Sequence, residues 1–211
     1  MNDSITKVKV YVTDKANSFQ NKLAIPFSET EFEKRSVRTV TDFMERLNEH
    51  IGDFKISSVD TAEIAPNFCA FISVKTTQMG KASKMMYNFP ILNGFLAKNK
   101  FETAGAPFIE ITKWDRSNDS ITYDFCYPIV KLDSLPTSPL IKYKDFKGVK
   151  GLKAIYNGNY ITSDRAWYAL LGWAKNQGVE VIEKPIEIFH SNPNFGGNEL
   201  EWKAEVFMPL K

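Results

Sequence analysis

The sequence predicts an α+β fold that contains the same unit twice, each copy with a helix packed on antiparallel strands. Three observations lead to this prediction. The order strand, helix, strand, hairpin loop, strand occurs from about residue 56 to 129 and again from about 149 to 210. Short matches recur at corresponding places, since residues 126–129 resemble residues 207–210. Alternating apolar residues then assign one face of each strand to the helices.

Composition restricts the class of protein. Of 211 residues, 43% are apolar and 25% are charged, as in a soluble globular domain. The net charge of +2 is spread along the chain and forms no basic block, so direct DNA binding is not expected. Cys69 and Cys126 lack metal or redox spacing, and neither a signal peptide nor a membrane-spanning stretch is evident. We expect a cytoplasmic chain without a metal or a cofactor.

Residues 1–55 read as an N-terminal appendage. Residues 6–13 alternate as a half-buried strand does, and Ser36 can cap a helix over residues 37–50 that Gly52 ends. Residues 56–211 are the expected main domain, with repeat halves at about 56–130 and 149–210. The appendage can equally be the tail of a larger domain.

The first copy reads as strands over residues 56–64 and 68–75, a helix over 77–98, and a hairpin of strands over 108–112 and 120–129. Pro90 falls inside the helical pattern, which predicts a kink or two consecutive helices. Residues 130–148 form a crossover that can add an edge strand near residues 140–143.

The second copy is better patterned than the first. A strand over residues 149–156 leads through a glycine-containing turn to a helix over residues 162–177. Thr162 or Ser163 can cap this helix, and Gly178 ends it. Strands over residues 185–189 and 202–208 complete the unit.

Strand alternation predicts which side chains face away from the helices. In the last strand Ala204 and Val206 face the helices, which leaves Glu205 and Phe207 on the other face. The same reasoning, with Ile186 and Ile188 facing inward, puts four acidic and two aromatic residues on the outer face: Glu110, Asp124, Glu187, Glu205, Phe189 and Phe207. A solvated polar face explains most of these carboxylates.

Glu205 differs because its neighbours are large and apolar. A carboxylate in such surroundings suits cation recognition or acid–base chemistry. Tyr160 and Trp173 can line a cleft beside it, although plain core packing accounts for either ring equally well.

The second copy also resembles a known family. Residues 157–160, the tryptophan-containing helix, residues 185–190 and residues 202–209 look like the GyrI-like, or AraC-type effector-binding, domain. The resemblance implies a curved antiparallel sheet with two helices on its convex side and a ligand groove on its concave side. It also implies that Glu205 meets cationic or lipophilic ligands there. Phe189 and Phe207 stand where the family usually has tyrosines.

These observations lead to three hypotheses of function. The leading one is a stand-alone small-molecule-binding protein, such as an effector sensor. Its groove would be centred on Glu205 as counter-charge and would hold an amphipathic or cationic organic ligand between aromatic walls. The first alternative is a small-molecule hydrolase that uses Glu205 as general base or nucleophile. The second is a gyrase-inhibitor-like module that acts by binding a protein partner.

Overall fold

A computed structural model describes residues 9–13, residue 15 and residues 30–211. The chain divides into two compact units, Met1–Gly52 and Asp53–Lys211, and each is described by itself. Within the described residues, no helix has both the length and the apolar content needed to cross a bilayer.

The first unit contains the helix α2, Glu31–Gly52. The helix begins with a capping box, because the Thr30 hydroxyl accepts from the backbone N–H of Glu33 while the Glu33 carboxylate accepts from the N–H of Thr30. The predicted cap was wrong, since Ser36 lies inside the helix and donates to the carbonyl of Phe32. The expected strand at residues 6–13 lies partly outside the described residues, and residues 9–13 form no strand.

The second unit contains the remaining elements. In chain order they are β1 (Phe54–Ile56), β2 (Asp60–Ile64), β3 (Asn67–Thr76), α3 (Lys81–Lys98), β4 (Phe108–Asp115), β5 (Ser120–Pro128), β6 (Lys142–Phe146), β7 (Val149–Gly158), α4 (Arg165–Gln177), β8 (Ile186–Phe189) and β9 (Lys203–Pro209). Short 3-10 turns precede α4 at Tyr160–Thr162 and lie between β8 and β9.

Within the described residues nine strands form one antiparallel sheet, in the order β1-β7-β9-β8-β4-β5-β3-β6, with β2 also paired to β7. The centre of this order is the pair β8–β4, where Phe108 lies opposite Ile188. Moving outward from that pair, β9 corresponds to β5 and β7 corresponds to β3. This symmetry confirms the duplicated fold that the sequence predicted.

Two element predictions need correction. Residues 56–64 do not form one strand, because the segment between β1 and β2 leaves the strand conformation. In that segment the Ser57 hydroxyl accepts from the N–H of Ile155. Both short strands pair with β7 of the second copy. Pro90 does not divide the first helix in two, since α3 runs continuously from Lys81 to Lys98.

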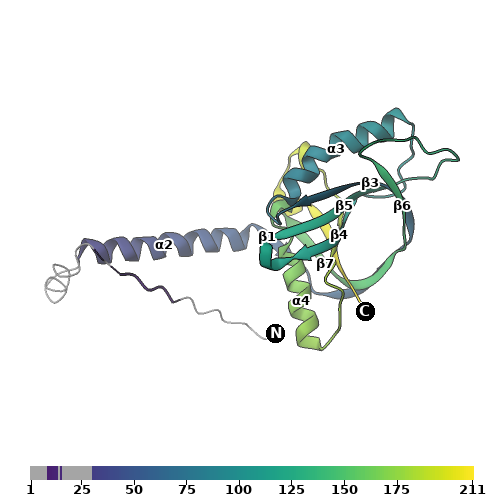
Figure 1. Cartoon of the computed structure of the whole chain (residues 1–211). Coiled ribbons are helices and arrows are strands. Elements are labelled where there is room, and N and C mark those ends of the chain that lie inside the picture. The colour runs from purple at the N-terminus through teal and green to yellow at the C-terminus, as the bar shows by residue number, and fades with distance from the viewer. Residues whose placement is uncertain (1–8, 14, 16–29) are drawn as a thin grey trace. The chain divides into compact units, whose positions relative to one another are not determined.

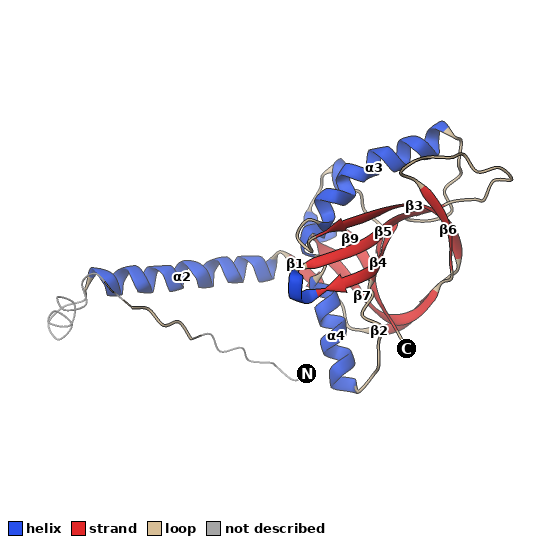
Figure 2. Ribbon diagram, in the orientation of Figure 1, coloured by secondary structure: helices blue, strands red, loops and turns tan. Residues whose placement is uncertain are grey.

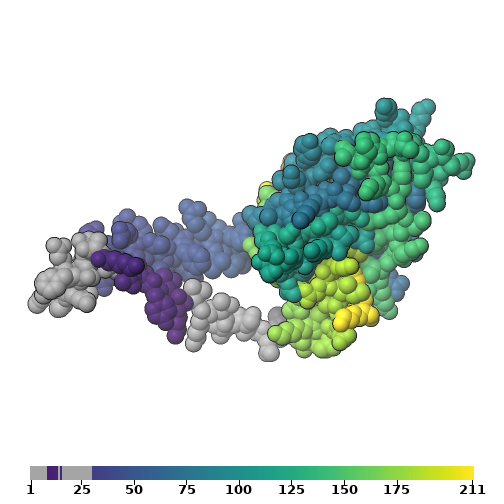
Figure 3. Space-filling view, viewed as in Figure 1, coloured from purple at the N-terminus to yellow at the C-terminus, as the bar shows by residue number. Residues whose placement is uncertain are grey.

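The sheet curves, with α3 and α4 on its outer, convex face (Figures 1 and 2). Leu92 of α3 and Trp167 of α4 pack on this face in the main core. A second apolar cluster that contains Phe71, Phe108 and Phe207 lies on the opposite, concave face. In space-filling form the second unit is one closely packed body, coloured teal to yellow (Figure 3).

The face assignment of β8 was wrong by one residue. Phe189 belongs to the helix-side core, and Glu187 is fully buried against Lys81 of α3. Ile186 instead joins the concave cluster. Alternation gives the wrong phase here because the two isoleucines pack on an apolar concave cluster, while the charged residue of the strand, Glu187, is buried on the helix side. The assignments for β4, β5 and β9 agree with the structure.

Candidate functional site

A pocket of about 580 Å³ opens on the helix side of the sheet. Its walls come from the first half of α3, the segment before β4, strand β5, the turn before α4 and the segment after β8. The lining residues are Ala82, Ser83, Met85, Met86, Phe89, Ala106, Pro107, Phe125, Tyr127, Asn159, Tyr160, Ile161, Phe189, His190, Ser191, Asn192, Pro193, Asn194 and Trp202. Elements of both repeat halves therefore meet there, whereas the sequence predicted a groove on the opposite face.

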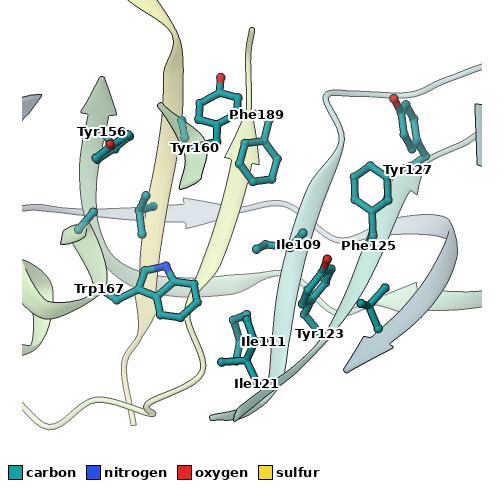
Figure 4. Close-up of a cluster of buried hydrophobic side chains, with 14 of the residues drawn as sticks. Ile109, Ile111, Ile121, Tyr123, Phe125, Tyr127, Tyr156, Tyr160, Trp167 and Phe189 are labelled. Atoms are coloured by element: carbon teal, nitrogen blue, oxygen red, sulfur yellow. The ribbon is translucent and has the colours of Figure 1, made fainter. Parts of the chain in front are cut away.

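Six phenylalanine, tyrosine and tryptophan rings line the pocket: Phe89, Phe125, Tyr127, Tyr160, Phe189 and Trp202. The Tyr160 ring centre lies 4.8 Å from that of Phe189 and 6.0 Å from that of Trp202. Across the sheet, the ring centre of Tyr127 lies 5.8 Å from that of Phe125. Figure 4 shows Tyr160 with Phe189 on one side and Phe125 with Tyr127 on the other. Such walls suit flat, apolar or aromatic molecules.

The two tyrosine hydroxyls of the pocket have different roles. The Tyr160 hydroxyl donates to the carbonyl of Lys203 at 2.8 Å and accepts from the N–H of Ser191 at 3.3 Å. It thereby ties the segment after β8 to β9. The Tyr127 hydroxyl, in contrast, makes no hydrogen bond to the described part of the chain. Burial raises the pKa of Tyr127 to about 12, so the hydroxyl stays neutral and is available to a ligand.

The charge inside the pocket is low. Among its lining residues in the described chain, none is an aspartate, glutamate, lysine or arginine. A charged ligand would therefore lose its hydration in the pocket and find no opposite charge among the lining residues, which is costly in free energy. The geometry favours a ligand with little net charge.

A buried ion pair lies on the same side of the sheet. The Lys81 ammonium donates to the Glu187 carboxylate at 2.5 Å and to the Ser163 hydroxyl at 2.6 Å. Ser163 donates in turn to the other carboxylate oxygen at 2.7 Å. All three side chains are fully buried, and the ammonium lies 4.7 Å from the ring centre of Trp167. The cluster joins α3 of the first half to β8 of the second.

Glu205 lies on the concave face and already has cationic partners. It does not itself line the pocket, although its neighbour His190 does. Its carboxylate lies 3.0 Å from the ammonium groups of Lys153 and Lys203 and 3.6 Å from the ring of His190. Burial raises the pKa of the Glu205 carboxyl, but hydrogen bonds from Lys153 and Lys203 outweigh it and lower that pKa. A general base needs a pKa near the working pH, so this environment does not favour base catalysis.

The other predicted residues divide between the two faces. Glu110 and Asp124 lie on the concave face, where Lys144 pairs with them at 2.5 and 2.6 Å. Phe207 lies there too, whereas Trp173 packs beside the main core without lining the pocket. Only Tyr160 and Phe189 of the predicted set line the pocket. In the described residues no group of three His, Cys, Asp or Glu side chains is placed to hold a metal.

The sequence interpretation missed several residues of this region. Strand alternation predicts that Tyr127 and Phe125 point toward the helices, but it does not show that they line a pocket. Lys81 and Ser163 were not singled out, because nothing local shows that they share a carboxylate with a distant strand. For Glu205, one sign of its pairing is visible in the sequence. Lys203 lies two residues away in the same strand, and hence on the same face of the sheet.

We expect Glu205→Gln to affect stability rather than binding. At neutral pH the variant should be less stable by about 1 kcal/mol, because Lys153 and Lys203 lose a carboxylate partner. The pKa of Glu205 is lower in the folded state than its ordinary value of 4.5, so its contribution exists above that value and disappears as the pH falls through the lowered pKa. Urea unfolding of both proteins between neutral and acidic pH measures this. A stability difference that stays constant down to pH of about 2 would contradict the assignment.

No family model and no curated protein sequence matches the chain. Solved structures, in contrast, do match it in fold. The EcmrR C-terminal domain superimposes with a TM-score of 0.62 at 15% identity, over 73% of this chain and 97% of that one. The EcmrR chain in an EcmrR–DNA complex matches 92% of this chain and 77% of its own length, with a TM-score of 0.61 and 12% identity.

An uncharacterized conserved protein from Listeria innocua superimposes with a TM-score of 0.51 at 12% identity, over 73% of this chain and 92% of that one. At these identities the likeness concerns the fold. It confirms the curved α+β fold that the resemblance to effector-binding domains implied.

Proposed function

We propose that this chain binds a small organic molecule in the helix-side pocket. The observation that carries the proposal is a cavity of about 580 Å³ whose walls are mostly apolar and aromatic, with a neutral tyrosine hydroxyl unpaired in the described chain. Pockets of this volume and lining are typical of sites for small ligands. The shared fold with a domain of EcmrR, whose chain is known in complex with DNA, is compatible with an effector-sensing role.

The proposed ligand is aromatic and carries little or no net charge. The pocket offers ring faces on both sides and a hydroxyl at Tyr127 that is unpaired in the described chain, and no carboxylate is among its described lining residues. A lipophilic cation would gain attraction from the ring faces but would lack a counter-charge. This differs from the hypothesis that Glu205 supplies that charge, because Glu205 is paired with Lys153 and Lys203.

The test uses two fluorescent probes with the same ring system, anthracenemethanol and an anthracenylmethyl trimethylammonium salt. We expect the neutral probe to bind about tenfold more tightly, since roughly 1.4 kcal/mol of uncompensated charge burial corresponds to that factor. Glu205→Gln should leave both affinities unchanged. Preferential binding of the cation that Glu205→Gln abolishes would overturn this proposal in favour of the counter-charge hypothesis. No saturable binding of any neutral aromatic compound would overturn ligand binding in this pocket.

A matched pair of methionines locates the site. Met86 lines the pocket and is 50% exposed, whereas Met79 is 67% exposed and lies outside it. Met86→Glu adds a carboxylate at the rim, so it should raise the affinity of the cationic probe several-fold, and Met79→Glu should not. Equal effects of the two substitutions would mean that the probe binds elsewhere.

A further inference from the structure

The helix α2 presents an apolar stripe that no other described residue of its own unit covers. None of its residues is buried. Val37 and Ile51, near its two ends, are 63% and 57% exposed, and Phe43 and Met44 between them are 49% and 45% exposed. Soluble proteins rarely leave so many large apolar side chains contiguous in water, and such patches usually mark interaction surfaces.

The spacing of the stripe is that of a coiled-coil seam. Its members are separated by three, four, three and four residues: Val37, Val40, Met44, Leu47 and Ile51. This 3.5-residue repeat keeps the stripe straight along a partner helix, over about 21 Å at 1.5 Å per residue. β-Branched residues at the first position of the repeat, as at Val37 and Ile51, with leucine at the fourth, as at Leu47, favour a pair of helices.

The residues that flank the stripe suit an identical partner. The flanks carry Ser36, Thr41, Phe43, Asn48 and His50, none of which is an aspartate, glutamate, lysine or arginine. Five such residues lie toward the outer face: Arg38, Asp42, Glu45, Arg46 and Glu49. Flanking charges normally choose the partner of a coiled coil. Here a second copy of the helix meets no like charge across the seam, and nothing on the flanks demands a different chain.

Helix stability supports the same conclusion. In proteins most of the stability of a helix comes from packing of its apolar face rather than from helix propensity. The capping box at Thr30 and Glu33 satisfies donors at the start of α2 but covers none of the stripe. We propose that α2 pairs with α2 of a second copy of this chain along the stripe, so that the chain self-associates through its first unit. This inference is independent of the proposed ligand.

The test compares the full chain with two variants by sedimentation equilibrium across a wide concentration range. Val40→Glu puts a charge in the seam, and Thr39→Glu puts the same charge on the outer face of the helix. We expect a wild-type dimer, a dimer for Thr39→Glu, and at least a tenfold weaker association for Val40→Glu. A wild-type monomer at every concentration would overturn the proposal, as would unchanged association of Val40→Glu.

Cysteine cross-linking gives a second measurement that does not depend on destabilising the helix. Cys69 and Cys126 are buried, so a Met44→Cys variant carries one exposed thiol at the middle of the stripe. Two paired α2 helices bring these thiols together in either orientation, and oxidation should yield a covalent dimer. A control with Thr39→Cys should cross-link much less. Equal cross-linking of both variants would contradict pairing along this stripe.

Discussion

Lys81→Met is expected to lower the free energy of unfolding by about 3–5 kcal/mol, the cost of removing one partner from a buried ion pair. Methionine has nearly the length of lysine, so packing around α3 changes little. Glu187, which is fully buried, then keeps the hydrogen bond from the Ser163 hydroxyl but loses its cationic partner. Its charge remains in a low-dielectric interior without compensation. Urea unfolding of the variant against the wild type measures the loss.

The matched controls separate a buried pair from an exposed one. Arg116→Met removes a pair with Glu183 whose side chains are about half exposed, and it should cost less than about 1 kcal/mol. The double variant Lys81→Met with Glu187→Leu removes both charges, and it should recover most of the stability. If Lys81→Met alone costs no more than Arg116→Met, the ion pair does not stabilise the contact between the two repeat halves.

This ion pair also shows where prediction from sequence stops. Alternation gave the correct face for β5, because Tyr123, Phe125 and Tyr127 are apolar and Asp124 between them is polar. In β8, Ile186 and Ile188 face an apolar cluster of their own. Hydropathy therefore gives this strand the wrong phase, because it assumes that Glu187 faces water. The partner that allows this carboxylate to be buried lies 106 residues away in the sequence.

The pocket was beyond prediction for a related reason. The repeat, the helices and most strands follow from local patterns, and they fix which face of the sheet carries the core. The pocket is assembled from segments of both halves that are distant in sequence, so no local pattern marks it. Tyr160 was identified because it precedes a helix in a glycine-containing turn, yet its part in holding the segment after β8 depends on Lys203 and Ser191.

Tyr160→Ala is expected to have the largest effect on binding. The side chain is 2% exposed and its ring contacts both Phe189 and Trp202, so its removal should cost about 3–5 kcal/mol of stability and remove one wall of the pocket. We expect probe affinity to fall by two orders of magnitude or more, because the pocket loses the Tyr160 ring and the segment after β8 loses one of its hydrogen-bonded ties to β9. Thermal unfolding and probe titration measure the two effects separately.

Tyr160→Phe divides this effect between ring and hydroxyl. It keeps the aromatic wall but leaves the N–H of Ser191 without its acceptor and removes one of two donors to the carbonyl of Lys203, which keeps its bond from the N–H of His190. The cost should be about 1–2 kcal/mol. Affinity should then fall only several-fold. Tyr168→Ala is the control, since that ring is 43% exposed and outside the pocket, and it should leave affinity unchanged. If Tyr160→Ala binds the neutral probe as the wild type does while remaining folded, the ligand site lies elsewhere on the molecule.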